Sequence, residues 1–348
     1  MKAGIIGGRG TGKSTVFRAL TGLRPIPGAA DAKARARPGQ IKVADARLDT
    51  IESLYSSQKK VQAELTVVDF APNPKEQKEG AALDPSLIPL IRDIDALLVV
   101  IPQIAAMDRE LVAEVRNIDA ELVFADFAQA ERRLERMKKE KAPSDIERAA
   151  LEKCVTTLEH GKALRTIQLT TQEKQALAGY GFLSQKPALV VTNCEYDRAT
   201  SAITDSERDA LREHGLEAFR LAAAFEAELW ELDADAHREF LKEAGLDAPA
   251  RDRLVAALST YMGLLTYYTA GENEARAWTL PRGATALDAA ANVHSDLARG
   301  FIRAEVMSHD EFVALGSEAK MREAGKLRLE GRDYVVKDAD ILKIRFKV

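Results

Sequence analysis

The sequence predicts an α/β protein with a mostly parallel sheet, an inserted helical hairpin and a small α+β domain at its C-terminal end. Three observations predict this arrangement: apolar runs suited to buried strands, two long amphipathic helical patterns in the middle of the chain, and short strand patterns separated by turns after residue 275. At 348 residues the chain is longer than one core usually supports, so we expect two or three domains.

Composition and charge narrow the class of protein. With 46% hydrophobic and 30% charged residues the chain can build ordinary globular cores, and a net charge of -4 gives no general reason to expect DNA binding. Two cysteines without metal-ligand or redox spacing are typical of a reducing compartment. The longest apolar run is residues 96–101, and the first strand pattern begins at Lys2. We therefore expect no signal segment, no membrane association and a cytoplasmic location.

The first elements are a strand over Lys2–Ile6, a glycine-rich loop and a helix over Lys13–Thr21. The loop matches the pattern Gly-x-x-x-x-Gly-Lys-Ser, which is typical of a P-loop. Its backbone N–H groups are expected to surround phosphate oxygens, Lys13 to reach the β and γ phosphates, and Ser14 to bind Mg²⁺. A chance match is the alternative, but the strand and helix are in the order that a P-loop requires. The predicted nucleotide-binding residues here are Gly7, Gly8, Arg9, Gly10, Thr11, Gly12, Lys13, Ser14 and Thr15.

A second strand pattern, residues 65–69, ends at Asp69. An acidic residue at this place in a P-loop protein holds the Mg²⁺ shell, so Asp69 is the expected Walker B aspartate and, with Lys13, a candidate catalytic residue. The runs at 96–101 and 188–192 are continuously apolar, as in parallel strands buried on both faces. Together these patterns predict a P-loop GTPase-like sheet.

Asn193 follows the last of these runs. In GTPases an asparagine at this place ties the base-binding loop together, and an aspartate three residues later reads guanine. Here that position is Tyr196, which has no carboxylate to accept two hydrogen bonds from guanine. We therefore expect ATP or GTP as ligand, without selectivity for guanine. The alternative for Asn193 is an ordinary turn residue at a strand end.

Too many residues separate the strands at 96–101 and 188–192 for a single crossover helix. Helical patterns over residues 119–141 and from a capping Ser144 to about His160 predict an antiparallel coiled-coil hairpin. Its tip, residues 131–142, has three acidic residues against six basic ones: Arg132, Arg133, Arg136, Lys138, Lys139 and Lys141. This charge predicts either a binding patch or a solvated helix face with i,i+4 pairs.

The C-terminal part has strand patterns at 276–280, 301–307, 326–329, 334–336 and 341–348, which predict a small α+β domain. The expected organisation is a nucleotide-binding domain over residues 1–117 and 187–275, the helical insert over 118–186 and the C-terminal domain over 276–348.

From end to end the chain resembles the YchF family of Obg-like ATPases. Arg276-Ala277-Trp278-Thr279 and Gly300-Phe301-Ile302-Arg303-Ala304-Glu305 are similar to that family's TGS domain, a β-grasp fold, and Leu151-Glu152-Lys153-Cys154 is similar to its coiled-coil insert. The resemblance implies a translation-type GTPase fold, slow hydrolysis with a preference for ATP, and the ribosome or its RNA as partner. It also implies that Asn193, Cys194 and Ala223 lie at the base.

The chain departs from this family in its switch segments. Pro72 stands where the family has a glycine whose N–H contacts the γ-phosphate, and Asn73 stands where it has a hydrophobic residue. Residues 34–37 lack the family's threonine for Mg²⁺. Two functions stay open: a slow ribosome-associated ATPase, and a nucleotide-dependent ribosome- or RNA-binding module in which hydrolysis is lost.

Overall fold

The computed structural model describes residues 1–24, 36–71, 81, 83–105, 107–108, 110–140 and 144–347. The chain forms two compact units, Met1–Ile41 with Thr66–Leu254 and Lys42–Leu65 with Val255–Val348. The first unit contains the glycine-rich loop, and the second contains the C-terminal strands. The three-part division predicted from the sequence has other boundaries, since it places residues 42–65 and 255–275 in the nucleotide-binding domain, and it stays a prediction.

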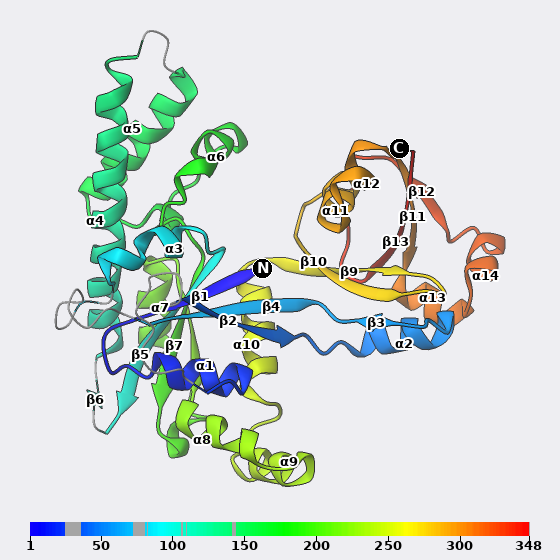
Figure 1. The fold of residues 1–348 in the computed structure, drawn as a ribbon, viewed down its shortest axis with the longest axis horizontal. Coiled ribbons are helices and arrows are strands. Elements are labelled where there is room, and N and C mark those ends of the chain that lie inside the picture. The colour runs from blue at the N-terminus through cyan, green and yellow to red at the C-terminus, as the bar shows by residue number, and fades with distance from the viewer. Residues whose placement is uncertain are drawn as a thin grey trace. The chain divides into compact units, whose positions relative to one another are not determined.

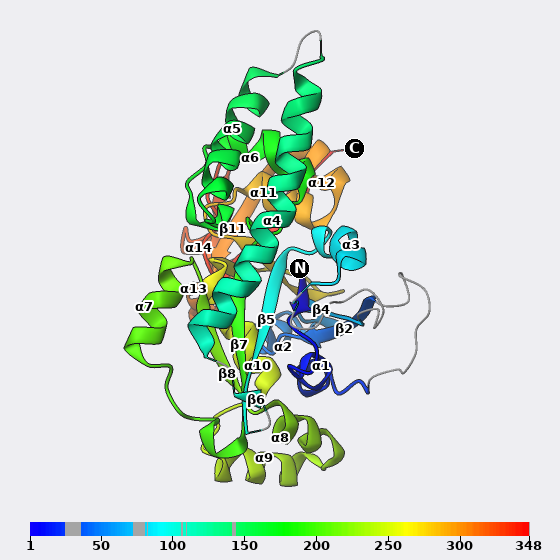
Figure 2. The same cartoon turned by 90° about the vertical axis from the view of Figure 1, so that its left-hand side faces the viewer.

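The first unit is built on a sheet of strand order β2-β4-β1-β5-β7-β8, with β6 beside β5; Figure 1 labels the strands up to β7, and Figure 2 labels β8 beside β7. β1 runs parallel to β4 and to β5, β5 to β7, and β7 to β8, while β6 is antiparallel to β5. A mostly parallel sheet was predicted from the sequence, although β8 was not. Every residue of β7 and all but the last of β5 are buried, which explains their continuous apolar sequences. The strands are β1 (Lys2–Ile6), β2 (Ala36–Lys42), β4 (Glu64–Phe70), β5 (Ala96–Ile104), β6 (Met107–Asp108), β7 (Ala188–Cys194) and β8 (Glu217–Leu221).

Helices connect these strands. The α1 helix follows β1 with the bounds predicted from the sequence, ends at Gly22 in a left-handed conformation and packs against α8. The helices are α1 (Lys13–Thr21), α3 (Ile88–Arg92), α7 (Asp205–Glu213), α8 (Ala223–Glu228), α9 (Ala234–Glu243) and α10 (Ala250–Tyr261). Short 3-10 turns lie at Pro85–Leu87, Leu164–Thr166, Ala178–Tyr180, Tyr196–Arg198 and Leu229–Glu231.

The predicted hairpin consists of α4 (Leu111–Met137) and α5 (Asp145–Glu159), which lie side by side in Figures 1 and 2 and are followed by α6 (Thr171–Leu177). Ser144 caps α5 as predicted. The α4 helix begins before the predicted residue 119, because the carboxylate of Glu110 accepts hydrogen bonds from two N–H groups of its first turn. Among the described helices, none has the length and apolar character needed to span a bilayer.

The second unit has a sheet of order β12-β11-β13-β9-β10-β3. Its strands are β3 (Lys60–Val61), β9 (Leu264–Ala270), β10 (Ala275–Pro281), β11 (Phe301–Ser308), β12 (Arg328–Glu330) and β13 (Asp340–Phe346). Its helices are α2 (Ala46–Tyr55), α11 (Ala286–Val293), α12 (Ser295–Arg299), α13 (His309–Leu315) and α14 (Glu318–Glu323). The predicted strand at 334–336 is wrong: Val335 is half exposed and makes only an isolated bridge to Thr285.

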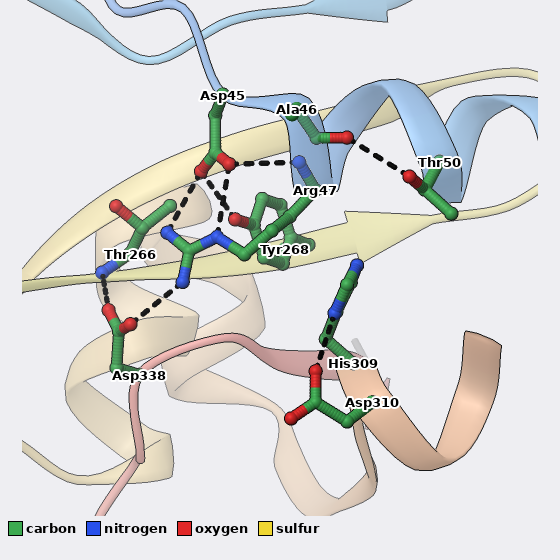
Figure 3. Close-up of polar contacts among 9 residues, drawn as sticks. All are labelled: Asp45, Ala46, Arg47, Thr50, Thr266, Tyr268, His309, Asp310 and Asp338. Atoms are coloured by element: carbon green, nitrogen blue, oxygen red, sulfur yellow. Dashed lines mark hydrogen bonds and ion pairs between the residues drawn. The ribbon is translucent and has the colours of Figure 1, made fainter. Parts of the chain in front are cut away.

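The α2 helix joins this unit although it lies between β2 and β4 in sequence. Figure 3 shows Asp45 at its start, where the carboxylate accepts from the N–H of Arg47 at 3.0 Å and from the hydroxyl of Tyr268. The Arg47 guanidinium donates to Asp338 at 2.8 Å, and Asp338 accepts from the N–H of Thr266 at 2.9 Å. This network attaches α2 to β9 and to the turn before β13.

Candidate functional site

The glycine-rich loop lies between β1 and α1 and depends on its glycines. Gly7 and Gly12 have φ values of 147° and 93°, which side chains rarely allow. A Cβ atom at Gly7 would lie 2.7 Å from the carbonyl oxygen of Val100, and one at Gly12 would lie 2.3 Å from Nδ2 of Asn193. Larger residues would therefore disrupt the curl of backbone at the start of α1, which is the part that can surround an anion.

Lys13, Ser14 and Asp69 meet at the end of this loop. The Lys13 ammonium donates to the carbonyl oxygens of Gly7 at 2.8 Å and Gly8 at 2.6 Å. The Ser14 hydroxyl donates to Oδ2 of Asp69 at 3.1 Å, which brings together the two residues predicted to bind Mg²⁺. Burial lowers the pKa of Lys13 to about 8, although attraction to Asp69 opposes this change. Burial also raises the pKa of Asp69, against the effects of Ser14, Arg37 and Lys13.

The base-side residues lie at the ends of β7 and β8. The Asn193 amide donates from Nδ2 to the carbonyl oxygen of Thr11 at 3.2 Å, and its Oδ1 accepts from the N–H of Ala223 at 3.3 Å. Asn193 thus connects the glycine-rich loop to the start of α8. Cys194 is buried, whereas Tyr196 is 45% exposed and packs with a tilt against Phe225, their ring centroids 4.6 Å apart.

The other predicted loop residues differ in exposure. Arg9 and Gly10 are exposed, Gly8 and Thr15 are half-buried, and Thr11 is buried with its hydroxyl donating to the Gly8 carbonyl at 3.0 Å. Because Thr11 bonds within the loop, it fixes the loop's conformation.

The chain is similar over its full length to known proteins. The chain is 35% identical over 361 aligned residues to "Ribosome-binding ATPase YchF" of Pasteurella multocida, covering 100% of this chain and 99% of that protein. It belongs to the YchF family. The Bacillus subtilis protein of the same name is 32% identical over the full length of both chains. The family described as "YchF-GTPase_C: Protein of unknown function (DUF933)" matches residues 264–347.

A solved YchF structure has the same fold. The "Structure of the Schizosaccharomyces pombe YchF GTPase" superposes with a TM-score of 0.81 at 24% identity, covering 99% of this chain and 97% of that one. The mixed α/β fold with a P-loop sheet and a C-terminal domain, predicted from the sequence, is confirmed. The switch residues that depart from the YchF pattern, Pro72 and Asn73, lie outside the described residues, as do Ala34 and Arg35.

Arg37 also lies at this site, although no motif in the sequence identified it as a site residue. It is on β2, which is next to β4 in the sheet, and its Nη2 lies 3.7 Å from Oδ2 of Asp69. Its guanidinium lies 4.5 Å from the centre of the Phe17 ring, and Nη1 donates to the carbonyl oxygen of Arg24 at 2.9 Å. Nε and Nη2 are buried and have no hydrogen-bond acceptor within the described part of the chain.

The residues present fit the Mg²⁺ that a nucleotide-binding YchF protein would need. Mg²⁺ takes oxygen ligands and is usually held by one or two protein groups together with water and substrate phosphates. Oδ1 of Asp69 is buried and has no hydrogen-bond partner among the described residues, so it can accept a cation. No group of three or more His, Cys, Asp or Glu side chains suited to a metal occurs in the described ranges. A hydroxyl and one carboxylate are therefore the protein ligands that the site offers.

The basic tip of the hairpin is partly neutralised within the fold. Arg133 forms ion pairs with Glu140 and Glu147, and Lys138 lies 2.7 Å from Glu135. None of these pairs has the i,i+4 spacing of the solvated-face alternative, and the pair of Arg133 with Glu147 joins α4 to α5, so both alternatives stay predictions. The side chains of Arg132 and Arg136 donate only to backbone carbonyls of α4, at 2.8 and 3.3 Å, so within the described residues their charges stay unpaired. Lys141 lies outside the described residues.

Proposed function

We propose that this chain binds ATP in the loop Gly7 to Ser14 together with Mg²⁺ and hydrolyses it slowly in the cytoplasm, in association with ribosomes. The observation that carries this proposal is the contact of Ser14 with Asp69 beside a loop in which Gly7 and Gly12 leave no room for a Cβ atom. The names of the full-length relatives, which call them ribosome-binding ATPases, support the same function.

Each residue at the loop has a part in this function. Lys13 would exchange its two carbonyl partners, Gly7 and Gly8, for the β and γ phosphate oxygens. Backbone N–H groups from Gly8 to Thr15 would donate to the remaining oxygens at the start of α1. Ser14 and Asp69 would hold Mg²⁺, which neutralises charge on the phosphates when it is bound.

The base would lie near Asn193, Cys194 and Ala223. Asn193 holds this region together through its bonds to Thr11 and Ala223, so its role is to position the loop. Tyr196 supplies no carboxylate for guanine, and together with Phe225 it offers an aromatic surface. We infer that ATP binds at least as tightly as GTP.

Calorimetric titration with ATP and GTP, combined with phosphate release at saturating nucleotide, tests this function. We expect Lys13→Ala to abolish binding of both nucleotides. GTP binding more than about tenfold tighter than ATP, a difference of about 1.4 kcal/mol, would contradict the proposal for the base. The charge-matched control is Lys174→Ala, at an exposed position of α6.

A second candidate function is a nucleotide-dependent ribosome- or RNA-binding module without hydrolysis. Pro72 favours it, because proline has no N–H to offer to charge that develops on the γ-phosphate. Losing one such donor typically slows a reaction by about 10²–10³-fold. If slow hydrolysis survives, Pro72→Gly combined with Asn73→Leu should raise the phosphate-release rate. A brisk wild-type rate that these changes leave unaltered would refute this role for Pro72.

Ribosome association can be tested by co-sedimentation at two salt concentrations. We propose the tip of the insert as one contact, formed by three exposed basic residues that make no ion pair with another described residue: Arg132, Arg136 and Lys139. Changing all three to Glu should abolish sedimentation with ribosomes, and raised salt should weaken it steeply. The matched control changes three exposed lysines outside the tip to Glu: Lys162, Lys174 and Lys242. Equal loss in both triple variants would reject the tip as a specific contact.

A further inference from the structure

Arg37 holds two hydrogen-bond donors that nothing in the described fold satisfies. Nε and Nη2 are buried without acceptors among the described residues, and the side chain as a whole is 18% exposed. Buried donors of a charged group are costly to leave unpaired, and they are normally satisfied by protein, water or ligand. The carboxylate of Asp69 does not serve, since its nearest oxygen is 3.7 Å from Nη2, beyond hydrogen-bond distance.

The position of Arg37 is fixed by contacts on its other side. Its third nitrogen, Nη1, donates to the Arg24 carbonyl at 2.9 Å, and the guanidinium packs over Phe17, which is fully buried in α1. These contacts hold the planar group beside Asp69. A guanidinium fixed in this way can donate to oxygen atoms from two adjacent nitrogens at little further cost in side-chain entropy.

The charges around the loop favour an anion. Lys13 and Arg37 are both cations within reach of the single carboxylate of Asp69. Without a metal ion, the site therefore has a surplus of positive charge at the end of the loop where the terminal phosphates would lie. Arginine forms forked hydrogen bonds with phosphate oxygens, which match the pair of unsatisfied nitrogens.

We propose that Arg37 is a phosphate-binding residue: it donates from Nε and Nη2 to the terminal phosphates of the bound nucleotide and lowers the dependence of binding on Mg²⁺. The inference rests on the proposed binding of nucleotide at the loop. Arg37 lies on β2, next to the β4 strand that bears Asp69, so its positive charge is supplied by the same chain. Arg37 thereby stands close to the place where Mg²⁺ would neutralise the same phosphates.

Calorimetry of ATP and ADP binding, each in Mg²⁺ and in EDTA, tests this role without measuring hydrolysis. In EDTA, Arg37→Ala should weaken ATP binding by about 10- to 100-fold, the effect of losing charge-assisted hydrogen bonds. ADP should lose less, because it lacks the terminal phosphate. Mg²⁺ should narrow the difference between variant and wild type, since the metal ion then carries more of the neutralisation.

Two further variants separate the phosphate contact from a structural role. Arg37→Lys keeps the charge without the fork and should show an intermediate loss of ATP affinity in EDTA. Arg24→Ala removes an equal charge from a side chain that is 74% exposed, and it keeps the carbonyl that Arg37 uses, so its ATP affinity should match wild type. If Arg37→Ala does not fold, the ATP affinity of Arg37→Lys in EDTA tests the inference instead. A melting temperature equal to that of the wild type shows that this variant is folded.

Several results would overturn the inference. If Arg37→Ala bound ATP in EDTA as tightly as wild type while Lys13→Ala abolished binding, Arg37 would only support β2, and the proposed function would stand. Tighter binding by Arg37→Ala would mean that the guanidinium obstructs the site. If the wild-type protein bound neither nucleotide, the proposed function would fail and this inference with it.

Discussion

Replacing Tyr268 with phenylalanine tests how strongly the charged hydrogen bond at the start of α2 stabilises the second unit. The ring is fully buried and is kept in the variant, so the change removes only the hydroxyl that donates to Asp45. Tyr267→Phe is the matched control: this neighbouring ring is also 0% exposed, but its hydroxyl donates to the neutral carbonyl of Ala289 at 2.9 Å. Both variants lose one buried hydroxyl, and the acceptors of the two hydroxyls differ in charge. The Tyr267 hydroxyl also accepts a long hydrogen bond from the Asn292 amide at 3.4 Å.

The expected losses follow from that difference. A hydrogen bond to a charged group contributes about 1.5–3 kcal/mol to stability and one between neutral groups about 0.5–1.5 kcal/mol. Tyr268→Phe should therefore lower the free energy of unfolding by about twice as much as Tyr267→Phe. The chain has two tryptophans, Trp230 in the first unit and Trp278 in the second. Urea titrations followed by fluorescence in a Trp230→Phe background thus report on the second unit.

The same variant has a pH dependence of known sign. Burial alone would raise the pKa of Asp45, but hydrogen bonds from Arg47 and Tyr268 outweigh it, and the pKa is lower than its ordinary value. The pairing therefore stabilises the fold above about pH 4, the ordinary pKa of an aspartate, and is lost as pH falls below it. The deficit of Tyr268→Phe should be constant from pH 5 to 7 and shrink below about pH 4. A deficit no larger than that of Tyr267→Phe, or one that persists unchanged into acid, would refute this reasoning.

Three further changes test the first unit. Gly12→Ala should abolish ATP binding, because its Cβ would lie 2.3 Å from Nδ2 of Asn193; Gly179→Ala, with no atom within 4 Å, should leave calorimetric affinity unchanged. Asn193→Ala should lower the free energy of unfolding by about 1–3 kcal/mol through loss of two hydrogen bonds, whereas a stability equal to wild type would show that the amide does not hold the loop. Thr204→Ala removes the side chain that caps α7 at Glu207 and should cost about 1 kcal/mol in urea denaturation; no change would mean that the cap is replaced.

The central strands of the first unit could be predicted because strands buried on both faces have continuously apolar sequences. The β2 and β8 strands were not predicted: β2 is largely polar, and the residues of β8 are mostly half-buried. Their strand conformation comes from pairing with β4 and β7, which a local pattern does not reveal. The converse error occurred at Val335: the run of one aromatic and two β-branched residues, Tyr334 to Val336, suggested a strand, but the segment makes a single bridge.

The candidate site also has residues that local sequence could predict and residues that only a tertiary contact reveals. The loop from Gly7 to Ser14 could be found because its elements are consecutive in sequence. The approach of Arg37 to Asp69 could not, since it depends on the placement of β2 beside β4. The ion pair of Arg133 with Glu147 joins the two helices of the hairpin, so it too requires a tertiary contact.

Because α2 belongs to the second unit, its apolar side chains can be buried only after the C-terminal part of the chain has been synthesised. Leu48 and Ile51 emerge early from the ribosome, yet the residues that bury them include Tyr268, Phe312 and Ile341, which are made last. Until then these two apolar side chains lack their native cover. A fragment confined to residues 264–347, the part matched by the family description, would lack α2 and leave the same cluster open from the other side. The second unit is therefore completed only after nearly the whole chain has been translated.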